Sequence, residues 1–191
     1  LIAFGRQHGL KIGTIADLIH FRAKSETLIE RVVSKPVATA HGEFTLHAFA
    51  DRVGGTTHLA LTKGEIRGDV ETLVRVHEPL SVLDFLDPGS RRVAFTLDQA
   101  QEALAKHGHG VIVLLHRPEN GSDLLSRLTN EPDAGRPAVK WDPRIFGIGA
   151  QILRNLGVGR MKLLASPRKI PSMAGFGLEV TGYAASPSEL N

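Results

Sequence analysis

Two short polar motifs carry the side chains of this chain that are best suited to binding a charged ligand. Arg75, His77 and Glu78 close an apolar, strand-like run, and Asp142 and Arg144 flank a proline. Guanidinium groups bind phosphate oxygens strongly because they are always charged and donate paired hydrogen bonds. The motifs therefore favour contacts with a phosphate-bearing ligand. Asp142 followed by proline is also the usual start of a helix, so a purely structural role for the second motif stays open.

The chain contains no cysteine. This excludes disulfides, thiolate catalysis, thiolate metal ligands and iron–sulfur clusters. Histidine could replace thiolates, and His58, His77 and His116 are candidates. They lie on separate predicted elements and lack the close spacing of a helical H-x-x-x-H pair. We therefore predict no metal site and no cofactor for this chain.

Composition limits the remaining classes of function. With 191 residues, 42% hydrophobic and 23% charged, the chain can form one ordinary domain and an appendage. The net charge of +3 comes without a run of like charges, so we expect no nucleic-acid partner. The sequence has neither an apolar run long enough for a membrane span nor a signal peptide. We expect a cytoplasmic protein without a membrane partner, and the initial Leu1 suggests a piece of a longer polypeptide.

Apolar periodicity predicts an α/β fold in which a mixed sheet is flanked by helices. An antiparallel meander should come first, followed by strands alternating with helices. The predicted strands are 31–40, 42–50, 56–62, 72–77, 111–115, 161–165 and 177–182. The predicted helices are 96–107, 124–128 and 144–156, with a loop at 131–137, a turn at 170–175 and a frayed tail at 184–191.

The first residues differ in character from the rest. A helix is predicted over 1–8, and Thr14 is a plausible helix N-cap. Asp17 follows three residues later, which imitates a capping box. This segment reads as the helical end of a preceding domain.

From residue 63 onward, the order of the motifs resembles GTP cyclohydrolase II, the enzyme that commits GTP to riboflavin synthesis. K-G-E-I-R-G at 63–68 precedes R-V-H-E at 75–78, then come G-H-G at 108–110, H-R at 116–117, D-P-R at 142–144, L-G-V at 156–158 and P-R-K at 167–169. No one motif is specific, but their order and spacing are. The resemblance covers about 31–185 and implies a GTP cyclohydrolase II-like fold.

Residues 4–19 resemble the end of a second family, 3,4-dihydroxy-2-butanone 4-phosphate synthase. In bifunctional riboflavin proteins this synthase precedes the cyclohydrolase. The implied organisation is a synthase tail at 1–24, a linker at 25–31, the cyclohydrolase-like domain at 32–185 and a tail at 186–191. The implied partners are the synthase domain of the same polypeptide and a second copy in a homodimer. Magnesium is expected only in the synthase part.

The resemblance also assigns roles to single residues. In the family an arginine attacks the α-phosphate of GTP, assisted by an aspartate, and these positions correspond to Arg144 and Asp142. The remaining matches fall at positions that contact the substrate: Arg75, His77, Glu78, Glu119 and Lys169. GTP or another phosphate compound is therefore the expected ligand.

The family reaction needs a zinc ion held by three cysteines. This chain has E-P-L at 78–80 and approximately R-R-V-A at 91–94 where those cysteines belong. Zinc opens the imidazole ring by lowering the pKa of its bound water, so losing the ligands predicts loss of ring opening. The family's E-G-R also reads E-N-G at 119–121, which removes an arginine.

These observations lead to one main hypothesis and two alternatives. The main hypothesis is a degenerate GTP cyclohydrolase II-like domain that serves the fused synthase as a structural or regulatory module. One alternative is an active GTP-processing enzyme, for example one that releases pyrophosphate through Asp142 and Arg144. The other is a sensor that holds a phosphate compound with Arg75, Arg144 and Lys169 without chemistry.

Overall fold

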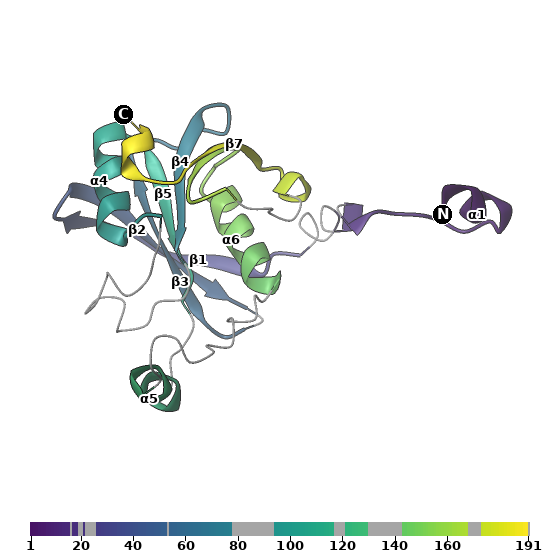
Figure 1. The fold of residues 1–191 in the computed structure, drawn as a ribbon, viewed down its shortest axis with the longest axis horizontal. Coiled ribbons are helices and arrows are strands. Elements are labelled where there is room, and N and C mark those ends of the chain that lie inside the picture. Colours follow the sequence, from purple (N-terminus) through teal and green to yellow (C-terminus); the bar gives the residue numbers. More distant parts are fainter. Residues whose placement is uncertain are drawn as a thin grey trace.

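The computed structural model describes residues 1–15, 17–18, 21, 26–52, 54–77, 94–116, 121–129, 143–167 and 173–190. Figure 1 shows the arrangement of its elements. The helices are α1 (Ile2–Gln7), α4 (Leu97–His107), α5 (Gly121–Thr129) and α6 (Pro143–Asn155), with the 3-10 turns η1 (Met173–Phe176) and η2 (Pro187–Leu190). The strands are β1 (Ile29–Thr39), β2 (Gly42–Asp51), β3 (Thr57–Lys63), β4 (Glu71–His77), β5 (Gly110–Leu114), β6 (Arg160–Leu164) and β7 (Glu179–Ala184).

The described strands form one seven-stranded sheet in the order β1-β2-β3-β5-β4-β6-β7. β1, β2 and β3 make the predicted antiparallel meander. β5 then pairs with β3 in the antiparallel sense and with β4 in the parallel sense. β6 and β7 continue the parallel part. The prediction of an α/β fold with a mixed sheet is confirmed.

Both faces of the sheet carry a hydrophobic core, because its central strands are apolar on both sides. On one face, Ile152 and Leu153 of α6 belong to a cluster with Val74 and Val113. On the other, Leu104 of α4 belongs to a cluster that contains Leu73, Ile112 and Phe44. Figure 1 shows α4 and α6 on opposite sides of the sheet. We call these the α6 face and the α4 face.

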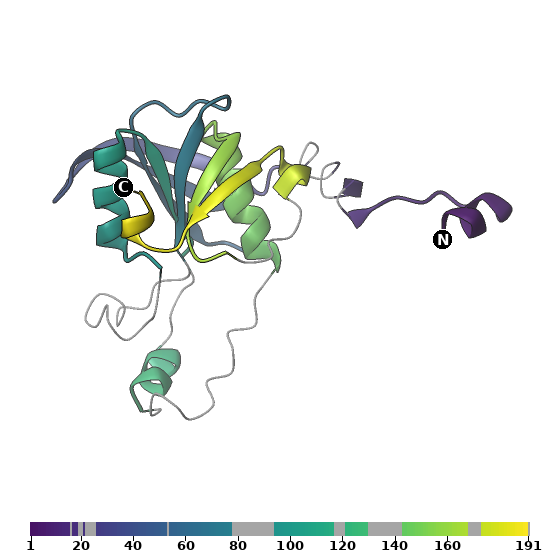
Figure 2. The ribbon, with the colours of Figure 1, turned by 45° about the horizontal axis from the view of Figure 1, so that its top comes forward.

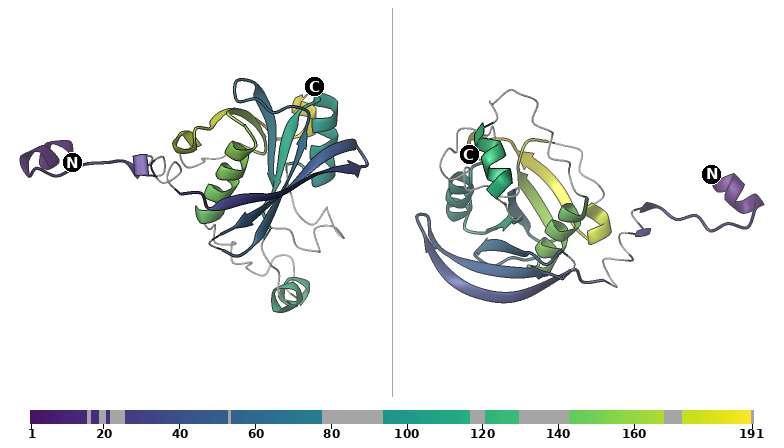
Figure 3. Two further views of the ribbon diagram at one scale, coloured as in Figure 1. Left: turned by 180° about the vertical axis from the view of Figure 1, so that it is seen from behind. Right: turned by 90° about the horizontal axis from the view of Figure 1, so that it is seen from below.

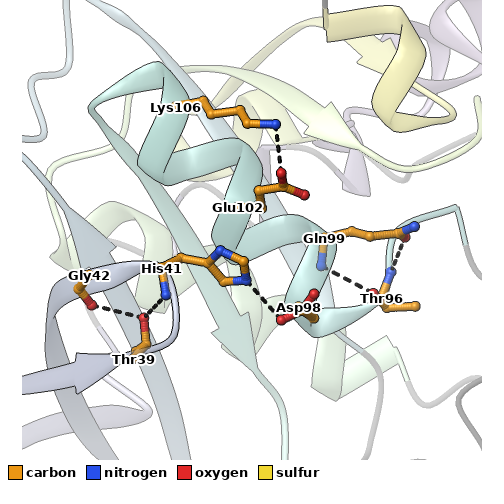
Figure 4. Close-up of polar contacts among 8 residues, drawn as sticks. All are labelled: Thr39, His41, Gly42, Thr96, Asp98, Gln99, Glu102 and Lys106. Carbon is orange, nitrogen blue, oxygen red and sulfur yellow. Dashed lines mark hydrogen bonds and ion pairs between the residues drawn. The ribbon is translucent and has the colours of Figure 1, made fainter.

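A capping box fixes the start of α4. The Thr96 hydroxyl accepts the Gln99 backbone N–H at 3.1 Å, and the Gln99 side chain accepts the Thr96 N–H at 3.0 Å (Figure 4). At the other end, Gly108 has a φ of 88°, and its N–H donates to the Leu104 carbonyl. Glycine adopts this left-handed conformation without steric cost, so it closes the helix there.

The turn between β1 and β2 rests on the first turn of α4. His41 Nε2 lies 2.8 Å from Asp98 Oδ1. Thr39 shapes the same turn, since its hydroxyl donates to the Gly42 carbonyl at 2.8 Å (Figure 4). The hairpin is long and curved (Figure 3), and this contact ties its tip to the helical layer.

Removing the Thr96 hydroxyl tests how much the capping box contributes. Thr96→Ala is expected to lower the free energy of unfolding by about 1 kcal/mol, the usual value of an N-cap side chain. Thr96→Ser keeps the oxygen and should stay near the parent. Urea unfolding followed by circular dichroism measures both. Equal stability of Thr96→Ala and the parent would contradict the role of the cap.

Both ends of the chain were predicted in part. Thr14 and Asp17 form the predicted box, since Asp17 N–H donates to the Thr14 hydroxyl and its carboxylate accepts the Thr14 N–H. The prediction of a frayed tail at 184–191 was wrong. Ala184 is the buried last residue of β7, and Leu190 in η2 packs against the cluster on the α4 face. β1 begins at Ile29, inside the segment predicted as a linker.

The N-terminal segment carries a dense set of exposed apolar side chains. Figure 1 draws α1 apart from the sheet. The exposed large hydrophobic residues of this segment are Leu1, Ile2, Phe4, Leu10, Ile12, Ile15, Leu18 and Phe21. None of the helices in the described ranges is both long and apolar enough for a membrane span.

Candidate functional site

The parallel strands place several polar residues at one edge of the sheet. β4 and β6 are both parallel to their neighbours, so the carboxyl ends of β4, β5 and β6 meet at the same edge. α6 leads into β6 from the opposite direction, so its amino end lies at this edge as well. Open α/β sheets commonly bind ligands outside the carboxyl ends of their strands. We call this region the carboxyl edge. Figure 2 shows α5 apart from the sheet.

Arg75 is a buried cation near the carboxyl edge. Its side chain is only 8% exposed. It follows Leu73 by two positions in β4, so it lies on the α4 face. Its Nη1 donates to the Leu164 carbonyl, the last residue of β6, at 3.0 Å. The guanidinium group therefore spans from β4 to the end of β6. The predicted strand over 72–77, which contains Arg75, is confirmed as β4.

His77 ends β4 on the same face as Arg75. It is 8% exposed, and its backbone carbonyl accepts the Leu115 N–H at 3.3 Å. Leu115 directly follows β5, so this bond extends the pairing of β4 and β5 by one residue. The structure thus brings Arg75 and His77 to the carboxyl edge together.

Arg144 is the second residue of α6, which places its backbone at the amino end of the helix. Pro143 opens the helix as the Asp-Pro motif predicts. The other predicted site residues lie outside the described residues: Asp142, Glu78, Glu119 and Lys169. Their roles stay predictions.

Sequence reasoning missed a polar arrangement around His58, on the α6 face. His58 is 3% exposed, and its Nδ1 accepts the backbone N–H of His116 at 3.1 Å. Its Nε2 lies 3.3 Å from the Thr56 hydroxyl. Burial lowers the pKa of His58; the nearby Asp51 carboxylate raises it, and His116 lowers it further. The signal in the sequence was an alternating strand that places this histidine on the same face as Ala60.

A second buried histidine, His47, lies on the α6 face. Its Nδ1 lies 2.8 Å from the Ser34 hydroxyl and its Nε2 lies 3.0 Å from the Thr62 hydroxyl. Burial and, less strongly, the Arg31 charge lower the pKa of His47. Hydroxyls hold this ring on both sides, so His47 joins three strands of the meander.

The residues do not fit the zinc ion of the GTP cyclohydrolase II resemblance. The sequence has no cysteine to supply thiolates. His77 lies on the α4 face and His58 on the α6 face, so the sheet separates them. Among the described residues, no group of three histidine or acidic side chains could hold a metal ion.

A glutamine of α6 binds the backbone just before β1. Gln151 Oε1 accepts the Leu28 backbone N–H at 3.0 Å. The Leu28 carbonyl in turn accepts the Arg52 N–H at 2.9 Å. The residues that lead into β1 are thus bonded both to α6 and to the end of β2.

Comparisons with known proteins give a consistent result. Residues 30–185 match the family description GTP cyclohydrolase II. A protein of Neisseria meningitidis serogroup B named 3,4-dihydroxy-2-butanone 4-phosphate synthase is 46% identical over 183 residues, which cover 96% of this chain and 50% of that protein. The riboflavin biosynthesis protein RibBA of Aquifex aeolicus is 40% identical over 192 residues, covering 94% of this chain and 47% of that protein.

A solved structure agrees with both relatives. The crystal structure of RibBX from A. baumannii, described as a two-domain 3,4-dihydroxy-2-butanone 4-phosphate synthase, has a TM-score of 0.59 and 38% sequence identity. The match covers 93% of this chain and 46% of that one. The chain therefore spans about half the length of the relatives it matches.

Proposed function

Because the chain belongs to the GTP cyclohydrolase II family, we propose that it is a domain of a riboflavin biosynthesis protein that has lost ring-opening hydrolysis. In this proposal the domain binds a phosphate compound at the carboxyl edge and acts as a structural or regulatory module of a fused butanone-phosphate synthase. One observation carries it: residues 30–185 match the family, while the sequence holds no cysteine for the zinc site.

The retained cations support phosphate binding. Arg75 is held at the carboxyl edge by the Leu164 carbonyl, so its guanidinium group is fixed before a ligand arrives. Arg144 starts α6, where the helix dipole also favours an anion. Asp142, Glu78, His77, Glu119 and Lys169 would complete the contacts as the family resemblance predicts. Because the Arg75 side chain is already held in place, it loses less conformational entropy when a ligand binds, and this favours affinity.

The N-terminal segment supports a role beside a second domain. Its apolar side chains, such as Phe4, Ile12 and Phe21, are exposed in the described structure, and burying them would be favourable. In the proposal, residues 1–24 belong to the synthase domain, and 25–31 lead into the cyclohydrolase-like domain. The relatives of twice the length, two of them named as synthases, are in keeping with this.

The bonds of Gln151 support a regulatory rather than a merely passive module. Gln151 lies two turns after Arg144 on α6, and it holds the Leu28 backbone on the path from the N-terminal segment. A shift of α6 on ligand binding would therefore also move the Leu28 backbone, which lies on the connection to the synthase. The synthase partner and a homodimer both remain predictions of this proposal.

Product analysis with GTP tests the proposal against an active enzyme. Incubation of the chain with GTP and zinc is expected to release no formate, since no thiolates hold the metal. GTP should still raise the melting temperature, because a ligand specific to the native state stabilises it. Formate release in proportion to added protein would overturn the proposal.

The same incubation distinguishes the proposed function from the alternative of a pyrophosphate-releasing enzyme. The position of Arg144 at the start of α6 favours this alternative. That alternative predicts pyrophosphate from GTP, with the release abolished in Arg144→Ala. The proposed function predicts none in either protein. A melting temperature unchanged by GTP, GMP and flavin nucleotides would leave only the structural part of the proposal.

A further inference from the structure

The side chain of His58 holds the backbone just after the end of β5. It lies on β3, and its Nδ1 accepts the N–H of His116, the second residue after β5. The chain then continues to 117–120, which contains the predicted contact residue Glu119. Backbone pairing of β5 with β3 ends at Leu114 opposite Leu59. The imidazole of His58 therefore continues the ladder from a side chain where the backbone pairing stops.

We infer that His58 is a positioning residue whose neutral imidazole sets the exit of β5 toward the ligand at the carboxyl edge. The inference rests on the proposed function for the ligand, but the bond to His116 can be tested without one. A neutral imidazole has one N–H and one acceptor nitrogen. Because Nδ1 accepts the His116 N–H, the hydrogen of the neutral ring is on Nε2, which donates to the Thr56 hydroxyl.

Protonation breaks this arrangement. A hydrogen on Nδ1 would face the His116 N–H, and two donors repel each other. His58 is 3% exposed, so water has little access to replace the lost bond. Burial lowers the pKa of His58, which keeps the ring neutral, and the Asp51 carboxylate opposes this effect. His116 is the other titratable group that acts on the ring, and its positive charge would disfavour protonation of His58.

The direction of the pH effect follows from the lowered pKa. A histidine whose pKa is depressed by folding contributes stability that is fully present above its unfolded pKa of about 6.5. That contribution is lost as the pH falls from there through the folded pKa. The bond to His116 and the ligand affinity that depends on it are therefore expected to weaken on the acidic side of neutrality.

Hydrogen exchange at the His116 amide is the direct readout. In the parent protein, exchange corrected for its intrinsic pH dependence should accelerate roughly 2- to 12-fold between about pH 8 and about pH 5, the range equivalent to one net hydrogen bond. His58→Asn places an amide oxygen near the position of Nδ1 and does not titrate, so protection should persist without the pH dependence. His58→Leu should lose the protection at every pH.

His47→Asn is the matched control. His47 is also a buried histidine on the α6 face, but its partners are the Ser34 and Thr62 hydroxyls. This variant should leave exchange at His116 unchanged. A local readout is needed because burial also lowers the pKa of His47 and His107, so global stability reports several histidines together.

Titration calorimetry with GTP over the same pH range tests the link to the site. Affinity should fall with the loss of His116 protection in the parent, and should stay level in His58→Asn. His116 protection that is unchanged between about pH 8 and about pH 5 would overturn the inference. So would full GTP affinity in a folded His58→Leu protein. If the parent binds no GTP, the ligand-binding part of the proposed function fails, while the exchange data still decide the role of His58.

Discussion

Arg75→Met is expected to weaken binding of GTP about 10- to 150-fold. The proposal assigns the ligand phosphates to a guanidinium group that β6 already holds through the Leu164 carbonyl. Losing one hydrogen bond from a charged group costs about 1.5–3 kcal/mol, which corresponds to this change in affinity. Methionine keeps much of the length and apolar volume of arginine, so the surrounding core stays filled. Titration calorimetry measures the change.

Two variants separate the guanidinium group from charge in general. Arg75→Lys keeps the charge but loses the paired donors, so its affinity should lie between those of the parent and Arg75→Met. Arg160→Met removes the same charge at the start of β6, where Arg160 makes an exposed ion pair with Glu179. It lies at the opposite edge and should leave GTP affinity near the parent value. Parent-like affinity in a folded Arg75→Met protein would rule out the assigned role.

Gly159→Ala is expected to lower the free energy of unfolding by about 3 kcal/mol, at the upper end for overpacking of a tight contact. A Cβ on Gly159 would lie 2.3 Å from the Gly68 carbonyl oxygen and 3.0 Å from the Gly68 Cα. Both neighbours are backbone atoms, so no side-chain rotation can relieve the overlap. The turn before β4 and the turn before β6 meet here, so the strain acts on the pairing of these two strands.

Thermal unfolding measures this effect, with a decrease of roughly 6–12 °C for a chain of this size. Gly68→Ala is the control at the same contact, because its added Cβ would meet the Gly157 carbonyl oxygen at 3.5 Å, an ordinary distance. Gly149→Ala on α6 tests the opposite sign. Its Cβ would meet Leu115 at 3.6 Å, and alanine favours a helix by up to about 1 kcal/mol. A Gly159→Ala protein as stable as Gly68→Ala would show that the turns move apart.

Local patterns in the sequence predicted the elements because short-range physics decides them. The alternation around Phe49 and His58 predicted β2 and β3, and Thr14 with Asp17 predicted a helix start that the hydrogen bonds confirm. Pro143 likewise marked the start of α6. In each case the deciding contacts lie within a few residues of each other, so they leave a local signature.

Contacts between distant segments left no such signature. Nothing in the apolar run of β5 indicates that it lies between β3 and β4 rather than beside β4 alone. The bond from His116 to His58 joins residues 58 positions apart, and periodicity shows only that His58 faces inward. A single leucine gives no periodic pattern, so the sequence predicts only a tail at Leu190, yet Leu190 packs on the α4 face. Of the candidate site, Arg75 and His77 stand out by residue type at the end of a strand-like run, but only the family resemblance assigns them roles.

The position of β5 also constrains the order in which the sheet can fold. β1, β2 and β3 are joined by short turns, so the meander can close early at a small entropy cost. β4 comes next along the chain, but it cannot pair with β3, because β5 occupies the place between them. Its two neighbours, β5 and β6, both follow it in the sequence, and β6 comes only after α6.

On a ribosome, both edges of β4 would therefore stay unpaired until the second half of the chain emerged. Such non-local pairing is slow and exposes strand edges to aggregation. Chaperone dependence and refolding yield are thus expected to be set by the arrival of β5, not by the meander.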